Sequence, residues 1–326
     1  MIGPWTRLRR GGVATFVVYL VTTLFALVPA TTLTSALAGA ADDARLFEPG
    51  GAVVLEAASA ARWALATVGL TTMGLIVLTL LLSPLLTVTW LASMTRPRPF
   101  SESFGVGVRC YWASILLAIM LAPLAAGACA LTVWLAMLVG EAFPSTSDPQ
   151  RHAAAMLVGA IPGLLLLAHV AAWHDLGRAA IAIGAEEPQA RAKHSMPPVA
   201  PPGTVSRAWR GFRAGARALI RGWAVPAYLI WLFIGAVLAV GAHALGWVLD
   251  ANIAWMALAL LAAQQFLALG RTLVRGRWLA GAVERALMAL HGTKEISLDL
   301  NDEFEIPTVP AHARPPPPPI PRNVPR

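Results

Sequence analysis

Six long apolar runs constrain this chain of 326 residues more than any other feature of its sequence. The runs occupy about residues 12–37, 63–92, 110–139, 153–173, 222–249 and 253–270. About 20 apolar residues are enough for a helix to cross the hydrocarbon core of a bilayer. Only 13% of the residues are charged, whereas a soluble domain carries about 25%. We therefore predict an all-α, polytopic membrane protein with six transmembrane helices.

The positions of the basic residues predict how these helices are oriented. Of 25 lysines and arginines, one flank of the predicted spans holds only Arg45, Arg62 and Arg151. Basic loops remain in the cytoplasm, so we predict three hairpins with both termini cytoplasmic. Lysine occurs only at positions 193 and 294, a bias typical of GC-rich bacterial genes, and we expect the bacterial inner membrane. The charge of +8 lies beside apolar runs rather than in a separate basic domain, which argues against nucleic-acid binding.

The first apolar run has two interpretations. It follows a basic start and ends near Ala36-Leu37-Ala38, which resembles the cleavage site of a signal peptide. The run is longer than a usual signal core, so we expect it to be retained as a span. Cleavage would leave five spans with the same orientation, so the orientation does not decide between the two.

The segment before the fifth run is the most basic part of the chain, and residues 204–221 read TVSRAWRGFRAGARALIR. On a helical wheel its arginines fall within one third of the circle: Arg207, Arg210, Arg213, Arg217 and Arg221. A neighbouring face holds Trp209, Phe212, Ala216, Leu219 and Ile220. We predict an interfacial helix whose arginines contact anionic lipid headgroups and whose apolar face meets acyl chains.

A polar cluster follows the fourth run, with His174, Asp175 and Arg178. Asp175 and Arg178 are three residues apart and can pair on one helix. His169 and His174 are five apart and point in different directions, so joint metal binding is not expected. We interpret the cluster as interfacial side chains near the membrane surface. Gln264 and Gln265 in the sixth run are expected to form hydrogen bonds between helices.

Hydroxyl groups form a stripe on the second run, with Pro84 inside it: Thr72, Thr79, Ser83 and Thr87. The stripe spans about 80° of a helical wheel. Small polar residues commonly pack membrane helices together, and we prefer that interpretation. The alternative is a polar path for a solute. On the fourth run, the Gly159-x-x-x-Gly163 spacing is a weak signal of close helix packing.

After the sixth run we expect the helix to continue to about Leu290 and to stop at His291-Gly292. Residues 293–326 then form an acidic and proline-rich cytoplasmic tail. Ile296, Leu298 and Leu300 alternate as in a short strand, and five consecutive prolines begin at Pro315. We expect this tail to be disordered. The alternative is that it docks to a cytoplasmic protein.

Several short motifs resemble a broad group of uncharacterised bacterial six-span inner-membrane proteins. They are Arg98-Pro99-Phe100-Ser101, the stretch from Trp173 to Ala179, and Gln264-Gln265 followed by Arg271 and Arg275. The pattern is more distantly similar to the membrane domain attached to some glycerophosphodiester phosphodiesterases. The catalytic domain of those enzymes is absent here, so the resemblance implies a fold and a location without a reaction.

The sequence predicts a protein that is not an enzyme and has no cofactor or metal, because no phosphate-binding loop, HExxH, CxxC or nucleophile elbow occurs. We expect a scaffold or accessory subunit that contacts anionic lipid and a cytoplasmic partner. A transporter or permease subunit for a small or lipidic solute is the alternative. A third hypothesis is a lipid-modifying enzyme at the membrane face that uses His174 and Asp175. The sequence does not indicate an oligomeric state.

Overall fold

The structure, a computed structural model, describes residues 3–38, 62–143, 149–185, 202–221, 223–248 and 254–299. Every regular element in these ranges is an α-helix. The helices are α1 (Pro4–Arg10), α2 (Gly12–Ala38), α4 (Arg62–Thr95), α5 (Phe100–Glu141), α6 (Pro149–Gly184), α8 (Thr204–Arg221), α9 (Ala224–Val248) and α10 (Ala254–Asp299). The predicted all-α fold is therefore confirmed for the described residues. Most of the predicted external segment at 38–62 and most of the tail lie outside them.

Four of the described helical stretches are long and apolar enough to cross a membrane. They are Gly69–Thr95, Phe100–Glu141, Gln150–Gly184 and Ala224–Ala242. A fifth results if α1 and residues Gly12–Leu27 of α2, which are bent by 69° at Gly11, count as one span. Each predicted span coincides with a helix. The last of the six falls on the start of α10, which is not among these candidates, so six spans remain a prediction.

Several helices extend beyond the apolar runs that predicted them. α5 begins at Phe100 rather than near Cys110, and α6 continues to Gly184. α10 passes through His291-Gly292 and ends at Asp299. The predicted stop at His291-Gly292 was therefore wrong, as was the strand-like reading at Ile296 and Leu298. A single glycine costs a helix only about 1 kcal/mol, which is too little to end one without a cap or a proline.

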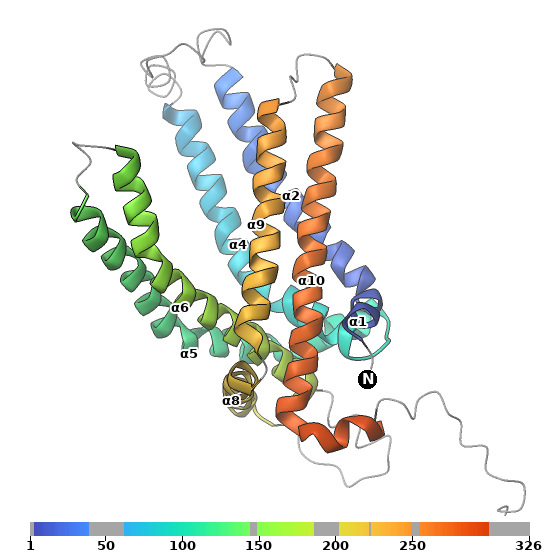
Figure 1. The fold of residues 1–326 in the computed structure, drawn as a ribbon. Helices are drawn as coiled ribbons and strands as arrows, with labels where there is room; N and C mark the ends of the chain where they lie inside the picture. Colours follow the sequence, from blue (N-terminus) through green and yellow to red (C-terminus); the bar gives the residue numbers. More distant parts are fainter. Residues whose placement is uncertain are drawn as a thin grey trace, which may run out of the picture.

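The buried core lies at one end of the helical bundle, where α4 ends, α5 begins and α6 ends (Figure 1). α1 and α8 lie at this same end. The largest fully buried side chains include Leu91, Met94, Leu117, Leu176 and Trp278. Towards the opposite end, α5 and α6 lean away from the other helices. The apolar stretches there keep many large side chains exposed, as expected where acyl chains are the solvent.

Glycines bring α5 and α6 into close contact along their length. A side-chain carbon at Gly163 would lie 2.5 Å from the Cα atom of Thr132, and one at Gly159 would lie 2.5 Å from the carbonyl oxygen of Leu135. Such backbone contact is possible only without a side chain. The weak Gly159-x-x-x-Gly163 signal therefore marks a true packing face. Proline at positions 84, 123 and 162 is tolerated inside these long helices, as is common in membrane spans.

We predict that Gly163→Leu destabilises the α5–α6 pair by about 3 kcal/mol, because the new side chain meets backbone that cannot move aside. Thermal unfolding of the protein in mild detergent measures this loss. Gly127→Leu is the matched control on α5, since a side-chain carbon at Gly127 meets no atom within 4 Å. Equal stability of the two variants would contradict the packing described here.

Candidate functional site

Residues 173–178, near the end of α6, connect this helix to three of its neighbours. Trp173 contacts α8, Asp175 contacts α10, and Arg178 contacts α5. The side chains of Asp175 and Arg178 are buried. These three side chains point in different directions from α6. This segment therefore helps to determine how α5, α8 and α10 lie relative to α6.

Asp175 is the centre of the polar cluster. Asp175 is only 2% exposed, and its carboxylate accepts two hydrogen bonds from the guanidinium of Arg275, at 2.7 Å from Nη2 to Oδ1 and 2.7 Å from Nη1 to Oδ2. The indole Nε1 of Trp278 donates a third, at 2.8 Å, to Oδ2. Arg275 and Trp278 are three residues apart and so share one face of α10. A bidentate arginine and an indole donor together neutralise and solvate a carboxylate that has lost its water.

The pairing of Asp175 differs from the sequence interpretation. Asp175 binds Arg275, which lies 100 residues away in the chain, rather than Arg178 on its own helix. The Nε atom of Arg178 donates instead to Ser114 Oγ on α5 at 3.0 Å. The buried Nε2 atom of His174 has no hydrogen-bond partner among the described residues. The Nδ1 atom of His169 lies 2.7 Å from the carbonyl oxygen of Leu165 on its own helix, and no group of three metal-ligating side chains occurs in the described residues.

α8 lies against α6 with glycines at the contact. A side-chain carbon at Gly215 would lie 2.9 Å from the backbone nitrogen of Gly177, and one at Gly211 would lie 2.9 Å from the carbonyl oxygen of Gly177. Trp173 Nε1 donates to the carbonyl oxygen of Phe212 at 2.9 Å, and the two rings are 4.6 Å apart. The helix predicted at 204–221 is therefore confirmed, and it is docked on protein by a face that the sequence analysis did not identify.

This docked face consists of small residues: Ala208, Gly211, Ala214, Gly215 and Ala218. Their spacing of three and four residues was the available signal, although it is common by chance in an alanine-rich chain. Phe212 and Leu219, which we expected to meet acyl chains, pack partly against the core. One part of the apolar face of α8 thus packs against the protein, and the other part is exposed.

The side chains outside the docked face of α8 are mostly exposed. Arg210, Arg213 and Arg217 are exposed, while Arg207 is half-buried and donates from Nη1 to the carbonyl oxygen of Arg109 at 3.3 Å. The side chain of Arg221 lies outside the described residues. Beside the arginines is an exposed apolar strip formed by Val205, Trp209 and Ile220. α8 therefore has a docked face, a basic face and an apolar strip.

Trp223 joins α8 to α9 in an unusual conformation. Its side chain is 81% exposed, and its φ of 47° lies in the left-handed region. A bulky residue rarely adopts that region without a structural reason. Tryptophan prefers the interface between water and lipid, and here the strained turn directs an indole ring outward at the end of the basic helix.

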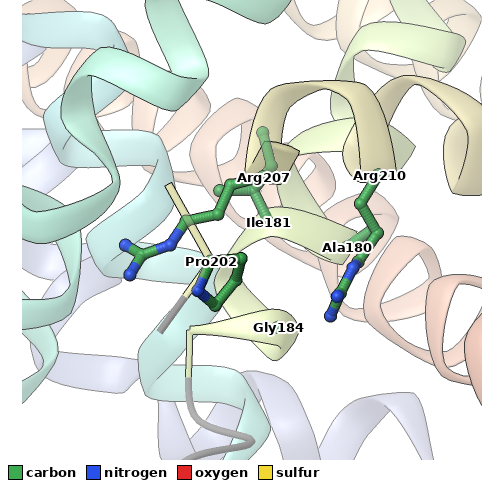
Figure 2. Close-up of a pocket in the computed structure, with 6 residues that line it drawn as sticks. All are labelled: Ala180, Ile181, Gly184, Pro202, Arg207 and Arg210. Atoms are coloured by element: carbon green, nitrogen blue, oxygen red, sulfur yellow. The ribbon is translucent and has the colours of Figure 1, made fainter. Parts of the chain in front are cut away.

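A small cavity lies between the end of α6 and the start of α8 (Figure 2). It is lined by Ala180, Ile181, Gly184, Pro202, Arg207 and Arg210. Its volume is about 10 Å³, which is roughly enough for one water molecule. It is therefore too small to hold an organic solute.

The hydroxyl stripe of α4 does not line this cavity. Thr79 is exposed on the surface of α4, and Thr72, Ser83 and Thr87 are half-buried. Gln265 of α10 makes an interhelical bond as predicted, because its Oε1 atom accepts from the hydroxyl of Tyr19 on α2 at 2.8 Å. Among the residues that the structure describes, the four stripe residues make no comparable bond between helices.

Comparisons with family models, with curated proteins and with solved structures find no match to this chain. Functional inference therefore depends on the geometry of the polar cluster and of α8.

We predict that Gly215→Leu separates α8 from α6, because the side chain would enter the backbone contact at Gly177. Backbone amides of residues 208–219 should then exchange hydrogen faster, in hydrogen–deuterium exchange read by mass spectrometry. Ala216→Leu introduces the same leucine next to Gly215, at a half-buried position outside the glycine contact, and serves as the control. Unchanged protection in the Gly215 variant would show that this contact does not hold α8.

Proposed function

We propose that this protein is a non-enzymatic scaffold or accessory subunit of the bacterial inner membrane, and that α8 is its contact surface for anionic phospholipid. The observation that carries the proposal is the division of α8 into a docked face, an exposed basic face and an exposed apolar strip. A helix of this kind at the interface attracts anionic headgroups through its arginines and places its apolar side chains among the acyl chains. Trp223 is suited to anchor the end of α8 at the same depth.

The proposed orientation follows from the same elements. Basic α1, basic α8 and the arginine-rich second half of α10 share one end of the bundle (Figure 1). We propose that this end is cytoplasmic, that six spans form three hairpins, and that residues 293–326 bind a cytoplasmic protein. The positive-inside rule supports this arrangement, since cytoplasmic flanks carry the excess of lysine and arginine.

The contacts of the polar cluster favour a structural role over a catalytic one. The Asp175 carboxylate is occupied by Arg275 and Trp278, and Arg178 by Ser114. A catalytic carboxylate must reach a substrate atom, whereas this one is enclosed by its partners. The cavity between α6 and α8 does not favour the transporter hypothesis, because it has room for about one water molecule and the α4 stripe does not line it.

The test uses full-length protein in nanodiscs that contain phosphatidylglycerol and phosphatidylcholine. We predict that replacing Arg210, Arg213 and Arg217 with glutamine lowers the association of phosphatidylglycerol at least about fivefold, since each arginine near an anionic surface contributes about 1 kcal/mol. Lipid association is measured by native mass spectrometry. The effect should shrink at about 1 M salt, where the screening length is about 3 Å.

Arg96→Gln combined with Arg109→Gln and Arg271→Gln is the control, because it removes the same charge outside α8. If the control and the α8 variant bind phosphatidylglycerol equally, net charge explains the association and the role assigned to α8 is wrong.

A further inference from the structure

α5 is longer than a helix needs to be to cross a bilayer. It has 42 residues, which corresponds to about 63 Å at about 1.5 Å per residue. The hydrocarbon core is about 30 Å thick, and membrane helices tilt by up to about 40° from the bilayer normal. At that tilt about 26 residues fit within the core, so at least about 16 residues of α5 lie outside it.

The beginning of α5 is the end that extends furthest beyond the hydrocarbon. Glu102 and Arg109 fall within its first ten residues and are exposed, whereas residues 110–140 contain no charged residue. Charged side chains are costly in hydrocarbon. Residues 100–109 therefore belong at the membrane surface or beyond it, at the same end of the bundle as α1 and α8 (Figure 1).

This beginning nevertheless carries an exposed apolar stripe, formed by Phe104, Val108 and Trp112. Their side chains are 39%, 53% and 67% exposed. Because they are spaced by four residues, they lie within about 80° of a helical wheel. Glu102 and Arg109 lie about 60–80° beyond the edge of this stripe. The exposed surface of residues 100–112 thus has an apolar side and a charged side.

The stripe continues without a break along the rest of α5. Ile119, Val133 and Met137 are exposed and fall in the same sector of the helical wheel as Phe104 and Trp112. On the part of a helix that crosses the bilayer, an exposed apolar face meets acyl chains. The stripe is therefore one end of a face whose other part is suited to contact lipid, and this continuity identifies lipid as its occupant.

Contacts within the protein hold the aromatic rings of this segment in place. The ring of Trp112 packs edge-on against Tyr111, with 5.3 Å between ring centres, and the Tyr111 hydroxyl donates to the carbonyl oxygen of Leu81 on α4 at 3.1 Å. The rings of Phe100 and Phe104 are 6.3 Å apart. Tryptophan and tyrosine are enriched where headgroups meet acyl chains. The stripe thus presents ordered aromatic side chains of the kind that anchor proteins at this depth.

We propose that residues 100–112 of α5 lie in the headgroup layer of the membrane as a second lipid contact of the protein. Phe104, Val108 and Trp112 face the acyl chains, and Glu102 and Arg109 face water. An inclined helix remains within the headgroup layer for more residues than an upright one, which agrees with the lean of α5 away from α9 and α10 (Figure 1). This contact needs no charge on the lipid, unlike that of α8.

The test measures the depth of spin labels on full-length protein in nanodiscs of phosphatidylcholine alone. Labels are attached to cysteines introduced one at a time, after Cys110 and Cys129 are replaced with alanine. Electron paramagnetic resonance compares label collisions with oxygen, which dissolves in hydrocarbon, and with a water-soluble nickel chelate. The ratio of oxygen to nickel collisions should rise along the stripe in the order Phe104→Cys, Val108→Cys, Trp112→Cys, Ile119→Cys.

Arg109→Cys is the matched control, because Arg109 is exposed, follows Val108 directly and points about 100° away from it. Its label should give a clearly lower ratio than the label at Val108. The melting temperature of each labelled variant shows whether it is folded, and the exposed positions should leave it unchanged.

Equal ratios at Val108 and Arg109, both typical of water, would overturn the proposal. So would labels at Phe104 and Val108 that neither reagent reaches, since a second copy of the chain or another protein would then cover the stripe. The discs contain no anionic lipid, so this result is independent of whether α8 binds phosphatidylglycerol.

Discussion

The structure depends on a buried carboxylate that one residue of a distant helix neutralises and a second residue of that helix hydrogen-bonds. Asp175 of α6 has lost its water, and without Arg275 and Trp278 it would be an unpaired charge in the core. Removing one partner of such a pair is strongly destabilising, even where the intact pair adds little. The side chain of Arg275 is 41% exposed, so the pair lies at the boundary of the core. The ion pair therefore favours the arrangement of α6 and α10 in which Asp175 meets Arg275, in addition to any stability that it adds.

The arrangement of α8 follows from the position of α6. Once α6 is held by α5 and α10, the backbone of Gly177, which carries no side chain, contacts Gly211 and Gly215 of α8. Small residues permit this approach, and the bond from Trp173 to Phe212 fixes its orientation. Arg213 and Arg217 are left on the exposed side of the helix, while Arg207 remains half-buried and contacts the start of α5. The exposed basic face of α8 is thus the consequence of packing on its opposite face. On the proposed function, this docking would spare α8 the entropy cost of ordering on lipid.

Local features of the sequence predicted the helices and the basic face of α8. Apolar length defines where a span lies, and the spacing of Arg207 to Arg217 defines which face of a helix is charged. Both properties can be read within about 20 residues. The extra turns of α5 before Cys110 and of α6 after Trp173 could not be read this way. Polar residues such as Glu102, Asp175 and Arg178 interrupt the apolar runs there, and packing at the core end keeps these turns helical.

The hydrogen-bond partners of the buried polar residues could not be predicted from the sequence, because they lie far apart in the chain. Nothing near Asp175 points to Arg275, because the two meet only after α6 and α10 have packed. The local alternative, Arg178, was chemically suitable and was assigned to Asp175 for that reason.

A double-mutant cycle between Asp175 and Arg275 tests the central claim most directly. The free energy of unfolding and the hydrogen exchange of α8 are measured for Asp175→Asn, Arg275→Gln and the double variant. The account predicts that each single change costs about 3 kcal/mol and loosens α8, and that the double variant loses clearly less than both together, because no charge is left unpaired. Additive losses, with the exchange of α8 unchanged in all three variants, would contradict it.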